Sequence, residues 1–273
     1  VVTQPDKPKG RGKTLMPTPV KEEAVKHDIP VYQPLKVRDP EFVEILEGLA
    51  PDIIVVAAFG QIIPKKILDM PKYGCINIHA SLLPKYRGAA PIQQAVIDGE
   101  KESGVTIMRM ATGLDTGDMI SKVVVPIEAE ETGGSLFDKL AQAGAELLTE
   151  TLPSIENGTA VYEKQPEESP TPYAAMIDKK MGLMDFSKSA EELERLVRGL
   201  NPWPSAYTFL NGKTLKVWKS TVEKTANSGE TAPGTVTAVD KAGIHVACGE
   251  DTLVLCEVQL EGKKRMETDA FLR

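Results

Sequence analysis

An uninterrupted apolar run at residues 53–59, Ile-Ile-Val-Val-Ala-Ala-Phe, constrains the fold of this chain more than any other stretch. Polar and apolar residues do not alternate in it, which is typical of a β-strand covered on both faces of a sheet. A helix is predicted just before it, because Asp39 and Pro40 form a helix-start signal and the apolar residues that follow recur at helical spacing. A further helix is predicted at residues 135–148. Helices that alternate with such strands predict an α/β fold with a mostly parallel sheet.

The length and the proline pattern predict two domains. A chain of 273 residues is too long for one ordinary core and suits two domains of roughly 100 to 200 residues each. Prolines gather within residues 164–172, which indicates a linker. Beyond it, Ser189 and Glu192 form a capping box, and Asn211-Gly212 and later turns separate short strands, which predicts a small β-barrel. We therefore expect a first domain at residues 1–163, a linker at 164–176 and a second domain at 177–273.

The composition is that of an ordinary folded protein, with 41% hydrophobic and 26% charged residues. The longest apolar run is far shorter than the roughly 18 residues that a membrane helix needs, so we expect no membrane partner. The three cysteines have no CxxC spacing and the three histidines are scattered, so neither a disulfide framework nor a metal site is predicted. These features favour a cytoplasmic protein.

The charge is unevenly distributed. The net charge of -7 argues against general binding to polyanions, yet five basic residues and no acidic one lie in residues 7–21. The five are Lys7, Lys9, Arg11, Lys13 and Lys21. Two interpretations remain open for this patch: a solvated loop, or a docking site for a negatively charged partner.

The most informative chemistry lies in residues 75–118. Side chains alternate along a strand, so Asn77 and His79 are predicted to project from the same face of an extended segment at residues 75–79. A second strand-like run at residues 105–110 leads into a glycine-rich loop that presents Asp115. An amide, an imidazole and a carboxylate at strand ends are the groups expected of an acyl-transfer site.

Other interpretations of single motifs are weaker. His79 alone could be a structural residue. Asp115-Thr116-Gly117 matches the aspartic protease triplet, but that chemistry needs a second such carboxylate, and the chain has no second Asp-Thr-Gly. Ser81 lacks the glycines of a nucleophile elbow, and the Gly-Lys-Thr at residues 12–14 lacks the first glycine of a phosphate-binding loop.

Taken together, the motifs resemble those of the formyltetrahydrofolate-dependent formyltransferases, and the resemblance spans nearly the whole chain. The matching stretches are residues 3–6, 10–13, 77–84, 87–92, 113–118, 201–204 and 216–219. Within that family the similarity is greatest to members that formylate the amino group of initiator methionyl-tRNA with 10-formyltetrahydrofolate as donor.

The resemblance implies roles for particular residues. Asn77, His79 and Asp115 occupy the positions of the catalytic triad. The folate-binding loop is matched by Ser81, Leu82, Leu83 and Pro84. Arg11 and Lys13 lie in the basic loop that contacts the tRNA acceptor arm, which favours the docking interpretation of that patch.

The resemblance also implies an architecture: a Rossmann-like formyltransferase domain followed by an OB-like barrel that holds tRNA, without a metal, in a monomer. Two departures stand out. The family has about one βα unit before the position of Val1, and this chain ends soon after residues 263–266. The alternatives left open are a formyltransferase acting on a small amine such as glycinamide ribonucleotide, and a tRNA-binding fragment without activity.

Overall fold

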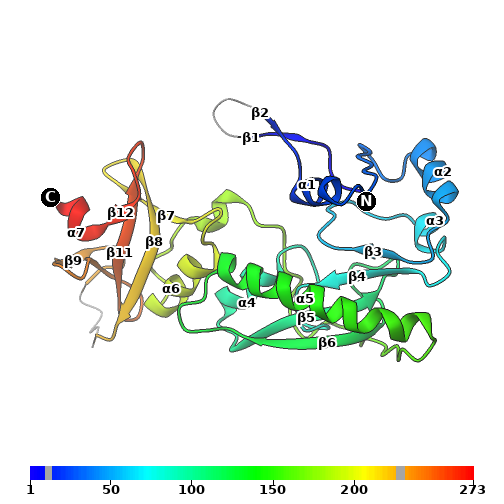
Figure 1. Cartoon of the computed structure of the whole chain (residues 1–273). Coiled ribbons are helices and arrows are strands. Elements are labelled where there is room, and N and C mark those ends of the chain that lie inside the picture. The colour runs from blue at the N-terminus through cyan, green and yellow to red at the C-terminus, as the bar shows by residue number, and fades with distance from the viewer. Residues whose placement is uncertain (10–13, 226–230) are drawn as a thin grey trace. The chain divides into compact units, whose positions relative to one another are not determined.

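The computed structural model describes residues 1–9, 14–225 and 231–273 (Figure 1). Arg11 and Lys13, the predicted tRNA contacts, lie outside the described residues. The chain divides into two compact units, each built from separate stretches. The first unit consists of Val1–His79, Ile107–Ile120 and Glu150–Lys164, and the second of Ala80–Thr106, Ser121–Thr149 and Gln165–Arg273.

Helices and strands alternate through the first half of the chain, and strands dominate the second. Up to residue 156 the elements are β1 (Lys7–Lys9), β2 (Thr14–Met16), α1 (Pro19–Lys26), α2 (Pro40–Leu49), β3 (Ile54–Val56), α3 (Lys65–Leu68), β4 (Cys75–His79), α4 (Pro91–Asp98), β5 (Glu102–Arg109), β6 (Met119–Pro126) and α5 (Gly133–Glu156). They are followed by a 3-10 helix (Lys179–Gly182), α6 (Ala190–Gly199), β7 (Ala206–Leu210), β8 (Lys213–Glu223), β9 (Val236–Val239), β10 (Ile244–Ala247), β11 (Thr252–Leu260), β12 (Met266–Glu267) and α7 (Thr268–Leu272).

One four-stranded sheet has the order β3-β4-β5-β6. Strands β3 and β4 are parallel, and Val56 is the partner of Asn77. Between β5 and β6 the chain turns back in a loop, where the Arg109 N–H donates to the Asp118 carbonyl at 2.8 Å. The α/β class is confirmed, but the sheet is mixed rather than mostly parallel. The reason is that a short loop joins β5 to β6 where a parallel pair would need a long crossover.

The core of the first unit lies where α2 and α3 pack against the sheet. Phe42, Leu46 and Ile67 are buried there together with Cys75, and Ile54 of β3 packs against them. Val55 points the other way and is 40% exposed. The prediction that this strand is covered on both faces is therefore wrong for Val55, because among the described residues these helices meet the Ile54 side of β3 and not the Val55 side.

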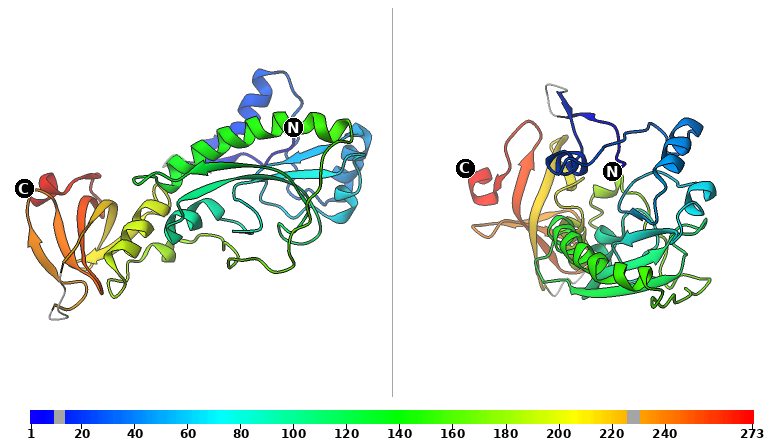
Figure 2. Two further views of the ribbon diagram at one scale, coloured as in Figure 1. Left: turned by 90° about the horizontal axis from the view of Figure 1, so that it is seen from below. Right: turned by 45° about the vertical axis from the view of Figure 1, so that its right-hand side comes forward.

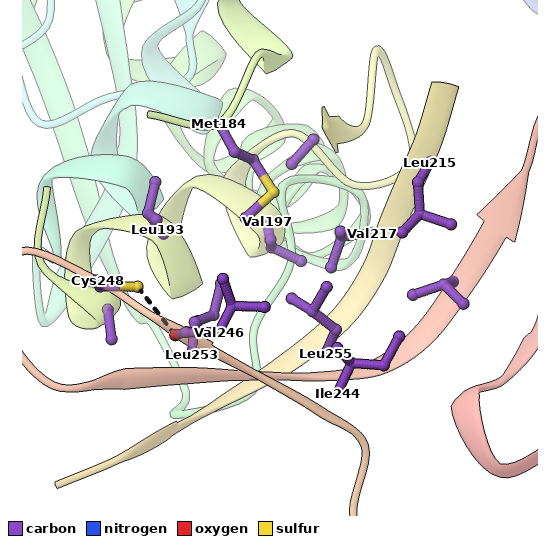
Figure 3. Close-up of a cluster of buried hydrophobic side chains, with 13 residues drawn as sticks. Met184, Leu193, Val197, Leu215, Val217, Ile244, Val246, Cys248, Leu253 and Leu255 are labelled. Atoms are coloured by element: carbon purple, nitrogen blue, oxygen red, sulfur yellow. Dashed lines mark hydrogen bonds between the residues drawn. The ribbon is translucent and has the colours of Figure 1, made fainter. Parts of the chain in front are cut away.

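The second unit contains residues 133–149 of α5, which run alongside β6 (Figure 2). Leu136 and Leu140 of this helix are buried, and the helix predicted at residues 135–148 is confirmed within α5. Helix α6 begins with the predicted capping box, in which the Ser189 side chain accepts from the Glu192 N–H and the Glu192 carboxylate accepts from the Ser189 N–H. A hydrophobic cluster joins α6 to β8, β10 and β11 (Figure 3).

The C-terminal sheet is antiparallel, with the order β7-β8-β11-β10-β9 and with β12 beside the second half of β11. Among the strands of the described residues, β7 and β9 end this sheet without pairing to each other, so the predicted closed barrel is not confirmed. The inner face is instead covered by α6, whose Leu193 and Val197 pack among the core residues of the strands. A helix can thus cover the apolar face without closure of the sheet edges.

No helix within the described part of the chain is both long and apolar enough to span a membrane.

Candidate active site

Strand β4 holds the first two predicted site residues. Asn77 and His79 are two positions apart in an extended segment, so their side chains project from the same face. The strand is fixed by its parallel pairing with β3 and by the Met110 N–H, which donates to the Cys75 carbonyl at 2.8 Å. His79 is buried and Asn77 is partly buried. The predicted strand at residues 75–79 is confirmed.

The loop between β5 and β6 holds the third predicted residue. Asp115 has a φ of +52°, in the left-handed region that Asp tolerates better than most residues. Gly117 is required by space, since a Cβ there would lie 1.7 Å from the Arg109 carbonyl oxygen. A Cβ on Gly113 would lie 2.2 Å from the Thr116 hydroxyl oxygen. The glycines thus let the loop fold tightly and present Asp115.

The structure brings His79 and Asp115 together inside the first unit. His79 Nδ1 lies 3.8 Å from Asp115 Oδ1, and the two side chains are only 6% and 15% exposed. This is ion-pair distance but longer than a direct hydrogen bond. The carboxylate therefore faces the Nδ1 side of the ring.

The predicted folate loop, Ser81–Pro84, belongs to the second unit and is held by the buried side chain of Thr106. The Thr106 hydroxyl donates to the Ser81 carbonyl at 2.7 Å and accepts from the Leu83 N–H at 3.1 Å. Ser81 Oγ donates to the Lys85 carbonyl at 2.7 Å. Both Ser81 and Leu83 are buried, so they brace the loop from within.

The other two residues of the loop line a pocket of about 370 Å³. Its lining residues are Leu82, Pro84, Lys85, Tyr86, Glu100, Glu102, Ser103 and Pro170. A volume of this size is within the range of roughly 300 to 1,000 Å³ that is usual for small-molecule sites. The loop therefore separates into a buried half and a half that faces open space.

Sequence reasoning missed the polar cluster beside this pocket. The Tyr86 hydroxyl lies 3.0 Å from Asp98 Oδ2 and 2.9 Å from Glu100 Oε1, while Lys85 Nζ donates to Glu100 at 3.0 Å. Burial, together with the hydrogen bond to Glu100, raises the pKa of Tyr86. Burial alone would raise the pKa of Glu100, but hydrogen bonds from Lys85 and Tyr86 lower it overall. No local motif signals this cluster. The support that Thr106 gives to the folate loop was missed as well, although Thr106 could have been noticed as a polar residue inside an apolar strand.

The described residues also bear on the basic patch and on metal binding. Lys21 of the basic patch is neutralised, because its Nζ lies 2.8 Å from Asp6 Oδ2. In the described stretches, no group of three or more His, Cys, Asp or Glu side chains could hold a metal ion.

Comparison with known proteins identifies the class. The formyl transferase family model matches residues 1–152, and the model of the formyl transferase C-terminal domain matches residues 176–273. The chain belongs to the formyl transferase family.

Two similar relatives are both methionyl-tRNA formyltransferases. That of Agathobacter rectalis is 58% identical over 273 residues, which is 100% of this chain and 87% of the relative. That of Bacillus subtilis is 56% identical over 274 residues, covering 100% of this chain and 86% of the relative.

Two solved structures share the fold at low identity. WlaRD, a sugar 3N-formyl transferase, has a TM-score of 0.66 and 20% identity, with 96% of this chain and 88% of that chain covered. HypX from Aquifex aeolicus, in complex with tetrahydrofolic acid, has a TM-score of 0.64 and 19% identity, with 92% of this chain and 43% of that chain covered.

Proposed function

We propose that this protein transfers a formyl group from 10-formyltetrahydrofolate to the free amino group of initiator methionyl-tRNA, giving N-formylmethionyl-tRNA for translation initiation. The observation that carries the proposal is the placement of His79 within 3.8 Å of Asp115, with Asn77 on the same face of β4. The similarity to methionyl-tRNA formyltransferases along the whole chain supports the choice of acceptor.

In this mechanism the amino nitrogen attacks the formyl carbon on N10 of the folate, and the formyl oxygen becomes negative. The Asn77 amide and the His79 ring donate hydrogen bonds to that oxygen. Removal of one such donor raises the barrier by roughly 2.7 to 4 kcal/mol in other acyl-transfer sites. The C–N bond to N10 then breaks, and the proton lost by the amine passes to N10.

Asp115 supports the charged form of His79. The carboxylate lies 3.8 Å from Nδ1, beyond direct hydrogen-bond distance, so its effect on the ring is electrostatic. The negative charge of Asp115 would stabilise positive charge on the ring while the oxyanion forms, and the pair would help to move the amine proton through water. General acid–base assistance of this kind contributes about 10² to 10⁴ in rate.

The loop Ser81–Pro84 is proposed to contact the folate. Its fit to a flat aromatic donor is supported by the open side of Leu82 and Pro84, whereas buried Ser81 and Leu83 keep the backbone in shape. The donor is a co-substrate, and no step in this mechanism requires a metal.

Residues 177–273 are proposed to form an OB-like domain on which the tRNA docks. Arg11 and Lys13 of the basic loop are proposed to contact the same tRNA. Residues 1–163 would form the Rossmann-like catalytic domain, and residues 164–176 the connection. Basic groups that contact RNA phosphates give an affinity that falls with salt. We further propose that the protein acts as a monomer in the cytoplasm.

The decisive experiment follows labelled formyl transfer from 10-formyltetrahydrofolate to initiator methionyl-tRNA and, separately, to glycinamide ribonucleotide. Wild type should formylate only the tRNA. Asp115→Ala should reduce kcat by about 10² or more. Asp138→Ala, which removes an exposed carboxylate from α5, should match wild type. Transfer to glycinamide ribonucleotide alone, or tRNA binding without any transfer, would reject the proposal.

A further inference from the structure

The segment at residues 165–174, named here the strap, is bound to the chain that follows the folate loop. Gly88 and Ala174 form a parallel β-bridge. The Ala174 N–H donates to the Arg87 carbonyl at 2.8 Å, and the Ala89 N–H donates to the Ala174 carbonyl at 2.7 Å. Gly88 has a φ of +119°, and a Cβ there would lie 2.5 Å from the Ala174 oxygen. The two backbones are therefore as close as glycine allows.

Two hydroxyl groups of the strap extend this attachment to the folate loop itself. Ser169 Oγ donates to the Pro84 carbonyl at 3.0 Å, and Thr171 Oγ1 accepts from the Tyr86 N–H at 2.8 Å. Pro170, between them, lines the same pocket as Leu82 and Pro84. Movement of the strap would thus move the end of the folate loop and one wall of that pocket.

The buried side chain of Arg87 holds the strap through three hydrogen bonds. It is only 1% exposed. Its Nε donates to Gln165 Oε1 at 3.0 Å, and its Nη1 and Nη2 donate to the carbonyls of Glu167 at 3.2 Å and Pro166 at 2.7 Å. All three of these acceptors belong to the strap.

A buried cation is costly unless its donors are satisfied, and here backbone and amide oxygens satisfy them. The planar guanidinium presents donors in a rigid fork, so it fixes three acceptors relative to one another. A lysine would keep the charge but could not reproduce that geometry. Arg87 therefore acts through the positions of its hydrogen-bond donors, which fix the strap, and not through its charge alone.

We infer that Arg87 is a positioning residue for use of the formyl donor: through the strap it fixes the loop that contacts folate. This inference rests on the proposed function, in which Ser81–Pro84 contacts the folate. The inference predicts different effects on the two substrates: disturbance of the strap should raise the KM for the folate donor and leave the KM for methionyl-tRNA unchanged.

The test compares Arg87→Met and Arg87→Lys with wild type in steady-state formylation. Both variants should raise the KM for 10-formyltetrahydrofolate by about tenfold, with kcat and the KM for methionyl-tRNA within about twofold of wild type. The matched control is Arg195→Met. Arg195 lies in the same unit and also donates to a backbone carbonyl, that of Ile97 at 3.0 Å, but from α6. It should leave the folate KM unchanged.

A second measurement reports on the strap directly. Limited proteolysis should cleave residues 165–174 faster in Arg87→Met than in Arg195→Met, and tetrahydrofolate should slow that cleavage in wild type. Should the Arg87 variants fail to fold, the milder pair Ser169→Ala and Thr171→Val removes the two hydroxyl contacts and should raise the folate KM in the same direction.

The possible results distinguish failure of the positioning role of Arg87 from failure of the proposed formyl transfer. An unchanged folate KM in folded Arg87 or strap variants of an active enzyme overturns the positioning role alone, as does an equal rise in both KM values. If wild type transfers no formyl group but binds tetrahydrofolate, the proposed function fails, and weaker tetrahydrofolate binding by the Arg87 variants still supports the positioning role. If wild type binds no tetrahydrofolate, both are rejected.

Discussion

At the scale of single residues, the position of Asp115 depends on the space left by Gly117. An alanine there would place its Cβ 1.7 Å from a backbone carbonyl, and backbone cannot swing aside as a flexible side chain can. Gly117→Ala should therefore displace Asp115 from His79 and reduce kcat by about 10². Gly48→Ala, at a helical position with nothing within 4 Å of the new Cβ, should leave activity intact. Equal activity of the two variants in the formylation assay would contradict this account of the loop.

Thr106 should matter to both stability and folate use. Thr106→Val removes the donor to the Ser81 carbonyl and the acceptor of the Leu83 N–H, and both groups remain buried. Urea unfolding should show a loss of about 2 to 6 kcal/mol, because two buried groups are left unsatisfied and each costs about 1 to 3 kcal/mol. The folate KM should rise as well. Thr149→Val, which removes an exposed hydroxyl from α5, serves as control and should change neither quantity.

The residues that sequence could predict are those placed by local rules. Alternation along β4 was sufficient to put Asn77 and His79 on one face, and the glycines around Asp115 were sufficient to predict a tight loop. The role of Arg87 could not be predicted in this way, because its acceptor Gln165 lies 78 positions away along the chain. No local spacing reports a contact of that kind.

At the scale of elements, β10 carries a pH-sensitive contact to its neighbours. His245 Nδ1 lies 2.7 Å from Glu223 Oε2 at the end of β8, and Nε2 lies 3.1 Å from Asp240 Oδ1 after β9. Burial lowers the pKa of His245, but hydrogen bonds to Asp240 and Glu223 outweigh it, so the pKa is raised above its ordinary value of 6.5. Protonated His245 therefore ties three strands together.

Because the folded-state pKa lies above the unfolded one, this stabilisation is fully present below about pH 6.5 and is lost as the pH rises through the folded-state pKa. The difference in unfolding free energy between wild type and His245→Gln should accordingly shrink from pH 5.5 to pH 8.5. His27→Gln, at a histidine two-thirds exposed, is the control for loss of a surface histidine. A difference that grows with pH would show that the contact has the opposite sign.

The capping box of α6 is a second test at this scale. Ser189→Ala removes the side chain that accepts from the Glu192 N–H, and the cost should be about 1 kcal/mol in urea unfolding. Ser187→Ala, just before the helix, should cost less. A loss no larger than that of the control would show that packing of α6 alone sets its stability.

The elements show where prediction from sequence ends. The capping box and the hairpin of β7 and β8 depend on residues a few positions apart, and both were predicted. The expectation of a mostly parallel sheet was wrong, because a short loop turns β6 back beside β5. Closure of the C-terminal sheet depends on whether strands far apart in the sequence pair, and the predicted closed barrel was not confirmed. The predicted burial of Val55 failed for the same reason, since it depends on what covers each face of β3.

At the scale of the whole molecule, the charge pattern predicts how the two substrates respond to salt. Added salt should raise the KM for methionyl-tRNA and leave the KM for folate almost unchanged, because RNA contacts displace counterions. Arg11→Ala should raise the tRNA KM and flatten its salt dependence. Lys21→Ala is the informative comparison, since Lys21 is already paired with Asp6 and should contribute less. An equal loss of tRNA and folate use in Arg11→Ala would contradict this division.

The interleaving of the two units has a consequence for biosynthesis. The chain passes from one unit to the other after His79, Thr106, Ile120, Thr149 and Lys164. Neither unit is a continuous stretch of polypeptide, so no single cut in the gene separates them. On the ribosome, the first unit can be completed once residues 150–164 have emerged, by which time residues 80–106 and 121–149 of the second have also been made. Residues 165–273, the longest stretch of the second unit, follow afterwards, so those two early stretches must remain without their remaining partners until the first unit is complete.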